Sequence, residues 1–115
     1  MPLLKIETNI DVAGNKLQTL MPAFSKLVAE TIGKPESYVM VSLSSAAMLM
    51  AGRPDAAAFA DLRSIGGLDD DVNRRLSQKI CGLLGQTLGI PADRIYVNFT
   101  DVPPGNWGWN SETFG

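Results

Sequence analysis

The chain has 115 residues, of which 45% are hydrophobic and 19% charged, and this length and composition suit one globular domain rather than a disordered segment. The net charge of −2 argues against nucleic-acid binding, which needs a concentrated basic surface, because the ten Lys and Arg residues are scattered. The chain has no histidine and one cysteine, Cys81, which excludes His-dependent triads, His-ligated metal sites and a disulfide within the chain.

The first ten residues, MPLLKIETNI, lack the basic segment, long apolar run and small-residue cleavage site of a secretory signal. No stretch reaches the roughly 18 apolar residues that a membrane-spanning helix needs. We therefore expect a cytoplasmic protein without membrane contact. The sequence leaves open export by a route that uses no signal peptide.

The first predicted element is a strand over residues 3–8, where Leu4 and Ile6 alternate with more polar residues as in a half-buried strand. Apolar side chains then recur at helical spacing between residues 17 and 28. This change from a period of two to a period of 3.6 predicts a strand followed by a helix.

The limits of this helix are predicted from proline and glycine. Pro22 is tolerated in a first helical turn, where amides have no intrahelical partner, so we expect the helix to begin near Thr19. Gly33 would end it as a left-handed C-cap. Residues 38–43 would form the second strand.

The second half of the chain predicts the same elements in the same order. Residues 59–65 read as a strand, and the acidic residues 69–71 suit the positive end of a helix dipole. An apolar stripe over residues 72–84 continues that helix, and Gly89 would cap it. Residues 95–100 form the last long predicted strand.

These two halves also carry an internal sequence repeat. The segment Thr31–Pro35, TIGKP, is echoed 56 residues later by Thr87–Pro91, TLGIP. A period of about half the chain indicates a duplicated unit rather than a solenoid. We therefore expect a single domain over 1–115 whose repeats span roughly 2–57 and 58–115.

Two strand-helix-strand units predict an α/β fold, a four-stranded mixed sheet with both helices on one face. Short edge strands from Met48–Met50 and from the tail beginning at Trp107 would be added to it. Alternation turns six residues toward the helices: Val39, Val41, Leu43, Ile95, Val97 and Phe99. It turns four away from them: Tyr38, Met40, Tyr96 and Asn98. Large apolar groups on this uncovered face favour an oligomer, although a sheet face can also simply meet water.

Pro2 is the candidate catalytic residue. Removal of Met1 would leave Pro2 with a secondary amine held in a ring. A free α-amino group titrates at about 7.7–8.0, and an apolar pocket lowers that pKa, which suits general acid–base catalysis near neutral pH. The alternative is that proline at this position marks only the removal of Met1.

The motifs around Pro2 are similar to those of the macrophage migration inhibitory factor family. The resemblance covers essentially the whole chain, and it rests on Met1-Pro2-Leu3, Gly33-Lys34-Pro35, Ser64-Ile65-Gly66, Cys81-Gly82-Leu83-Leu84, the segment 91–98 (PADRIYVN) and the segment 108–114 (GWNSETF). It implies the tautomerase fold and a homotrimer with three active sites, each at a subunit boundary.

The resemblance also implies roles for individual residues. Pro2 matches the N-terminal base, Lys34 the lysine that holds the substrate carboxylate, and Ile65 the residue whose backbone N–H binds the same end of the substrate. Tyr96 and Asn98 match residues from the neighbouring subunit, where Asn98 would hydrogen-bond the substrate and Tyr96 would line the pocket. Three aromatic residues match the pocket entrance: Tyr38, Trp109 and Phe114.

Each of these residues has an ordinary structural explanation as well. Lys34 suits the C-terminal end of a helix, where a cation meets the negative end of the dipole. Asn98 suits an open sheet face, Ile65 a strand end, and Trp109 and Phe114 a docked tail. The residues alone leave both explanations open, and the family pattern favours the site.

The implied reaction is the keto–enol tautomerisation of a 2-oxo acid such as phenylpyruvate, with dopachrome-type isomerisation as a related reaction. The substrate would be a small 2-oxo acid or its enol, and neither a metal nor an organic cofactor is needed. The alternative function is a cytokine-like signalling protein with weak or vestigial tautomerase activity. A weaker third hypothesis is hydration or decarboxylation, for which no additional Arg or acidic residue is evident near Lys34, Ile65 or Asn98.

The sequence also departs from the vertebrate members of that family. Residues 57–60, AAFA, replace a Cys-x-x-Cys pair, so thiol chemistry has no residues to carry it. Val12 and Ala46 stand at or near the positions of a receptor-contacting arginine and aspartate, and Gly67 replaces a lysine. Trp107 adds a large aromatic residue to the pocket rim, where it would narrow substrate choice or slow turnover unless it only packs the trimer edge.

Overall fold

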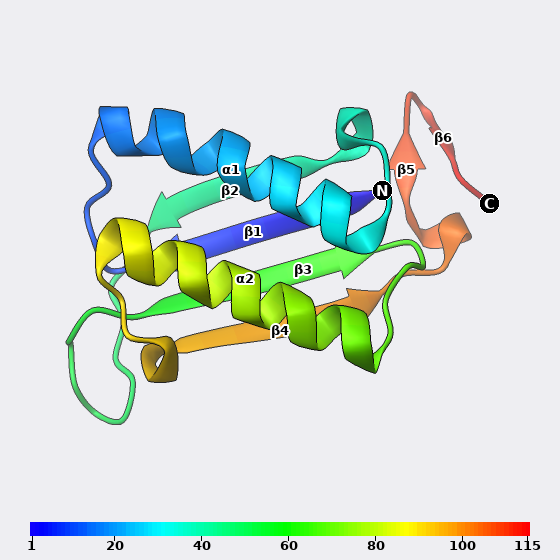
Figure 1. Cartoon of the computed structure of the whole chain (residues 1–115). Helices are drawn as coiled ribbons and strands as arrows, with labels where there is room; N and C mark the ends of the chain where they lie inside the picture. Colours follow the sequence, from blue (N-terminus) through cyan, green and yellow to red (C-terminus); the bar gives the residue numbers. More distant parts are fainter.

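The computed structural model describes residues 1–115 in full (Figure 1). The strands and helices, in chain order, are β1 (Pro2–Thr8), α1 (Gly14–Ile32), β2 (Met40–Ser45), β3 (Ala58–Ser64), α2 (Asp70–Leu88), β4 (Ile95–Asp101), β5 (Gly108–Trp109) and β6 (Glu112–Thr113). Three single turns of 3₁₀ helix connect them: Glu36–Tyr38, Ala92–Arg94 and Pro104–Asn106.

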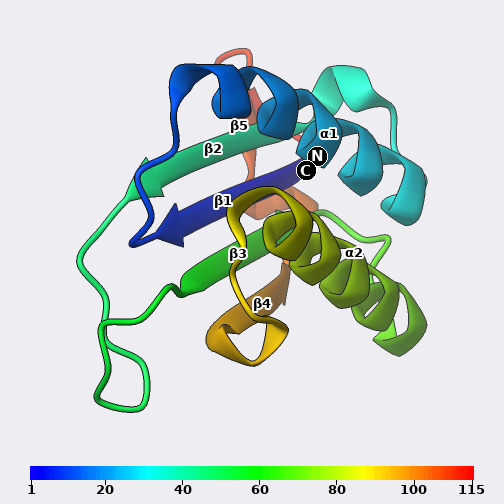
Figure 2. The same ribbon diagram turned by 60° about the vertical axis from the view of Figure 1, so that its left-hand side comes forward.

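The first four strands form one mixed sheet in the order β2-β1-β3-β4. The outer pairs, β1 with β2 and β3 with β4, are parallel, and the central pair of β1 with β3 is antiparallel. Figures 1 and 2 show both helices on the same side of this sheet, so no helix covers its other side. The predicted α/β architecture of two strand-helix-strand units is therefore confirmed.

The elements of the second half follow those of the first at a constant spacing. Strand β3 begins 56 residues after β1, and α2 begins 56 residues after α1. Both helices have 19 residues, and both end at a left-handed glycine, Gly33 with φ 80° and Gly89 with φ 70°. The predicted glycine caps are thus confirmed. Asp69 opens α2 as its N-cap, where its carboxylate accepts the Val72 N–H.

The predicted start of the first helix near Thr19 is wrong. Helix α1 begins at Gly14, and Pro22 lies inside it. Pro22 cannot donate to the Gln18 carbonyl, but both residues are exposed, so water can take that place. Burial of the other side of α1 against the sheet outweighs the cost of one internal proline.

Two further predictions differ from the structure. The second long strand begins at Met40 rather than Tyr38, because Glu36–Tyr38 forms a 3₁₀ turn in which the Tyr38 N–H donates to the Pro35 carbonyl. The predicted edge strands do not extend the sheet within this chain. Met50 makes a single bridge with Arg53, and the tail forms its own hairpin, β5 with β6.

The core lies between the sheet and the two helices. It is built from fully buried side chains of the central strands and both helices: Leu4, Ile6, Leu62, Leu20, Phe24, Val28, Leu76, Ile80 and Leu84. Burying one such side chain contributes roughly 1.5–3 kcal/mol, so this layer supplies most of the stabilisation that holds the N-terminal strand in the sheet centre.

The opposite face of the sheet is open. Met40 and Tyr96 keep 65% and 66% of their surface exposed, and Asn98 is exposed as well. Val41, Leu43, Val97 and Phe99 instead pack against the core, which confirms the predicted alternation within β2 and β4. Tyr38, which was expected on the open face, lies in the 3₁₀ turn before β2. No helix of the chain has the length and apolar character needed to span a membrane.

Candidate active site

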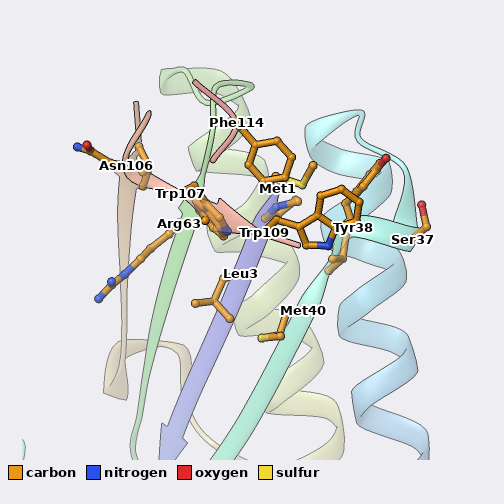
Figure 3. A pocket seen from close by; sticks show the side chains of 14 residues that line it. Met1, Leu3, Ser37, Tyr38, Met40, Arg63, Asn106, Trp107, Trp109 and Phe114 are labelled. Carbon is orange, nitrogen blue, oxygen red and sulfur yellow. The ribbon is translucent and has the colours of Figure 1, made fainter. Parts of the chain in front are cut away.

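A cavity of about 550 Å³ opens at the start of β1. The N-terminus and Leu3 form its floor, and the segment after α1 and the C-terminal segment form its walls (Figure 3). Nine of its fourteen lining residues are hydrophobic. Five predicted site residues meet here: Pro2, Tyr38, Trp107, Trp109 and Phe114.

The aromatic residues form a continuous rim. The Trp109 ring stacks on Phe114 with centroids 5.8 Å apart, and Tyr38 meets Trp109 edge-on at 6.1 Å. The hairpin between β5 and β6 makes this stacking possible, because Asn110 and Ser111 both adopt positive φ in its two-residue turn. The rim therefore combines Tyr38, from the 3₁₀ turn between α1 and β2, with Trp109 and Phe114 from the C-terminal segment.

The N-terminal amine lies in a partly desolvated place. The pKa of the Met1 α-amine is lowered, first because burial disfavours its charged form and second because the positive charge of Lys34 repels it. Pro2 itself is fully buried, one residue further into the sheet. While Met1 is attached, the Pro2 nitrogen is an amide and cannot act as a base.

Ile65 lies beside the N-terminus rather than in the wall of the main cavity. Antiparallel pairing of β1 with β3 sets Pro2 opposite Ser64, so continuation of the register brings Ile65 opposite Met1. Ile65 lines a small neighbouring hollow, which shares Val102 with the main cavity. Its backbone N–H donates to no group of the chain.

Lys34 is near the N-terminus without lining the cavity. It follows Gly33 at the end of α1, where both backbone N–H groups donate to the Ala29 carbonyl. Its side chain passes Gly67, whose position would bring a Cβ within 3.4 Å of the Lys34 Cε. The structure thus brings the Lys34 charge close enough to lower the pKa of the terminal amine.

Tyr96 and Asn98 lie away from the cavity of their own chain. They project from β4, which is separated from β1 by β3. Two strand spacings are about 9–10 Å, and both side chains occupy the open face of the sheet. One chain alone therefore does not assemble the full set of predicted site residues.

Comparison with known proteins agrees with this arrangement. The model of the macrophage migration inhibitory factor (MIF) family matches residues 1–115. The chain belongs to the MIF family. Among curated relatives, a MIF homologue of Trichuris trichiura is 38% identical over 99% of this chain and 100% of its own length. The Xenopus tropicalis MIF is 35% identical, with 99% of each chain covered.

Solved structures of the family have the same fold. A MIF homologue from Prochlorococcus marinus superposes with a TM-score of 0.94 at 40% identity, covering 98% of this chain and 99% of that one. A MIF-like protein from Entamoeba histolytica gives 0.93 at 33% identity, covering 98% of both chains. The predicted membership of the MIF family is thereby confirmed.

This MIF-family chain contains few groups for redox or metal chemistry. Ala57 and Ala58, which belong to the segment that replaces the Cys-x-x-Cys pair of vertebrate members, are buried at the start of β3. Burial raises the pKa of the Cys81 thiol, against a smaller opposing effect of a hydrogen bond with Ser77, so the thiolate is disfavoured. No three His, Cys, Asp or Glu side chains lie close enough together to hold a metal ion.

Arg63 also lines the cavity, although it was not among the predicted site residues. It is the one charged side chain among those that line the cavity, and its guanidinium donates to Asp61 Oδ2 from Nη2 at 3.0 Å and from Nε at 3.3 Å. In Figure 3 its side chain extends away from the aromatic rim. A sequence signal existed, because Arg63 directly precedes the Ser64-Ile65 motif and alternation turns it to the open face.

Proposed function

We propose that this MIF-family chain is a keto–enol tautomerase in which the amine of Pro2, freed by removal of Met1, is the general acid and base. The observation that carries this proposal is the position of the N-terminus. It lies at the floor of an apolar cavity with an aromatic rim, and the pKa of its amine is lowered there.

The proton transfer needs only one group, which alternates between a neutral and a protonated state. The neutral Pro2 nitrogen accepts the hydroxyl proton of the enol of a 2-oxo acid, which leaves the enolate. An oxygen electron pair then forms the carbonyl as the electron pair of the C=C bond takes the proton from the Pro2 ammonium at carbon 3. A group poised near the working pH serves both steps, and the surroundings that lower the pKa of the Met1 amine would act on a Pro2 terminus as well.

Lys34 and Ile65 would bind the substrate carboxylate. The Lys34 ammonium supplies a positive charge near the terminal amine, and the Ile65 N–H is a free donor on the neighbouring strand end. Hydrogen bonds from charged or oriented donors to a carboxylate are stronger than neutral ones. These contacts would hold carbon 3 of the substrate within reach of Pro2.

The aromatic rim would receive the substrate's side chain. A cavity of about 550 Å³ is in the size range of small-molecule sites, and its mainly hydrophobic lining favours an aryl group such as that of phenylpyruvate. Dopachrome-type compounds share this combination of a ring and a carboxylate. Family membership supports such small molecules as substrates and oligomerisation as the working state.

We further propose that the active form is a homotrimer. The open sheet face with exposed Met40 and Tyr96 supports association of chains through this surface. Tyr96 and Asn98 would then complete the cavity of a neighbouring subunit, because they lie outside the cavity of their own.

The direct test is the ketonisation of enol-phenylpyruvate by protein whose loss of Met1 has been verified by mass spectrometry. It should be compared with Pro2→Gly and with a variant that carries one extra residue before Pro2. Activity of the parent and its loss, by roughly 100-fold or more, in both variants would identify the terminal amine as the base. Equal activity of all three would refute the mechanism. An inactive parent would favour the signalling alternative, which does not need a free Pro2 amine.

A further inference from the structure

The loop that follows β3 turns sharply next to the N-terminus. Gly66 and Gly67 adopt φ values of 68° and 78°, a region that residues with a Cβ rarely enter. The bend comes directly after Ile65, whose N–H lies at the end of β3, so movement of this loop would also move the Ile65 N–H. Glycine adopts this region readily, so the contacts of the loop fix its conformation.

Two short hydrogen bonds hold Gly66 from opposite sides. The Ser64 hydroxyl donates to the Gly66 carbonyl at 2.7 Å, and the Gly66 N–H donates to Asp101 Oδ1 at 2.9 Å. Asp101 is the last residue of β4 and pairs with Ser64 in the parallel ladder. The next residue, Val102, continues the connection by donating its N–H to the Ser64 carbonyl at 2.8 Å.

This arrangement separates the roles of two adjacent amides. The Gly66 N–H is occupied by Asp101, whereas the Ile65 N–H has no acceptor in the chain and lies opposite Met1 in the register. The Ile65 N–H has no acceptor within the chain, and the residue next to it is held by a hydrogen bond. A backbone donor of this kind is suited to bind an anion from outside. Asp101 is exposed and needs no further partner for this contact.

We propose that Asp101 is a positioning residue of the active site. It fixes the loop 64–67 so that the Ile65 N–H faces the space beside the Pro2 amine, where the substrate carboxylate binds. Asp101 acts as a hydrogen-bond acceptor and not through its charge, since a negative charge here repels a carboxylate. This inference rests on the proposed function and goes beyond it, because it assigns a residue that does not touch the substrate.

The test compares three variants and two substrates. Asp101→Ala removes the acceptor, Asp101→Asn keeps an oxygen that accepts the Gly66 N–H, and Asp93→Ala removes an exposed carboxylate at the other end of β4 as a matched control. The substrates are enol-phenylpyruvate and its methyl ester. With Asp101→Ala, KM for the acid should rise on the order of tenfold with little change in kcat, as expected for one lost hydrogen bond to an anion. KM for the ester should stay unchanged, and the other two variants should resemble the parent with both substrates.

Three kinetic results would overturn the inference. These are a parent-like KM for the acid in Asp101→Ala, an equal rise for acid and ester, and an Asp101→Asn variant that behaves like Asp101→Ala. The first would mean that Asp101 does not position the loop. The second would mean that the substitution weakens binding without regard to the carboxylate, and the third that Asp101 acts through its charge.

A binding measurement distinguishes failure of this inference from failure of the proposed function. Titration of phenylpyruvate should shift the amide resonance of Ile65 in the parent and in Asp101→Asn, and the shift should be strongly reduced in Asp101→Ala. A Pro2→Gly variant that keeps full turnover would refute the proposed function while this binding result still holds. An Ile65 resonance that does not respond in the parent, or that responds equally in Asp101→Ala, would refute the role of Asp101.

Discussion

At the scale of single residues, the proposed chemistry depends on the protonation state of one amine. Burial and the charge of Lys34 both disfavour the ammonium form at the N-terminus. A like charge lowers the pKa of an amine, so its removal raises that pKa. The reaction consumes the neutral amine in its first step, so activity should rise as pH passes upward through this pKa.

A pH profile tests this point. We expect kcat/KM of the Met1-free protein to rise with pH along an acidic limb whose midpoint lies below the ordinary α-amino value of about 8. In Lys34→Ala the limb should move to higher pH, and KM for the acid should rise because an anion partner is lost. Lys16→Ala, an exposed lysine near the start of α1, is the control and should leave the limb in place. An unmoved limb in Lys34→Ala would separate Lys34 from the terminal amine.

Trp107 gives a second prediction at this scale. Its side chain lines the cavity, whereas its backbone carbonyl accepts the Phe114 N–H, so a smaller side chain should widen the cavity without breaking that bond. We expect Trp107→Val to raise kcat/KM for ring-substituted phenylpyruvates by about tenfold relative to phenylpyruvate, since steric fit in a pocket is worth 1–3 kcal/mol. Steady-state kinetics on both substrates measures this ratio. An unchanged ratio would mean that Trp107 only packs the edge of the structure.

At the scale of elements, the long connection between β2 and β3 is held by one buried cation. The Arg94 side chain keeps 6% of its surface exposed and donates to four backbone carbonyls, those of Met50, Arg53, Asp55 and Ala56, at 3.0–3.1 Å. A guanidinium has five N–H donors in a fixed geometry, so four carbonyls must be correctly placed to satisfy it without a carboxylate. It ties residues 50–56 to the start of β4.

Loss of this guanidinium should destabilise the fold. Arg94→Met leaves four carbonyls without their donor, and we expect the free energy of unfolding to fall by roughly 2–4 kcal/mol. Urea denaturation measures this change. The matched control is Arg74→Met on α2, whose exposed side chain makes one long contact of 3.8 Å with Asp71, and it should change stability by no more than about 0.5 kcal/mol. Equal stabilities of the two variants would contradict the role of Arg94.

At the scale of the whole molecule, the open face of the sheet exposes large apolar side chains that a single chain does not bury. We expect sedimentation to give the mass of three chains. Each proposed site combines Pro2 of one subunit with Asn98 of another, so mixing two inactive variants should restore activity. Refolding Pro2→Gly together with Asn98→Ala should produce some sites in which both residues are native, whereas each variant alone has none. A monomeric mass, or no recovery on mixing, would contradict the shared site.

Local sequence determined the order and type of the elements. The alternation around Leu4 and Ile6, the apolar stripes of both helices and the glycines at 33 and 89 are patterns that can be recognised within a few residues, and they predict the strand-helix-strand units. The start of α1 could not be predicted from local signals. Pro22 favours a helix that begins close to it, but burial of the helix against the sheet outweighs this local preference.

Tertiary structure alone decided how the site is put together. Pairing of β1 with β3 brings Ile65 opposite the N-terminus, the end of β4 brings Asp101 to Gly66, and the C-terminal hairpin brings Trp109 to Tyr38. Each contact joins residues far apart in the chain, and each depends on the sheet register and on the path of a loop. Periodicity and propensity report the state of a segment and carry no information about its partner, so the sequence by itself determined the elements and the candidate residues, and the packed structure determined which of them meet.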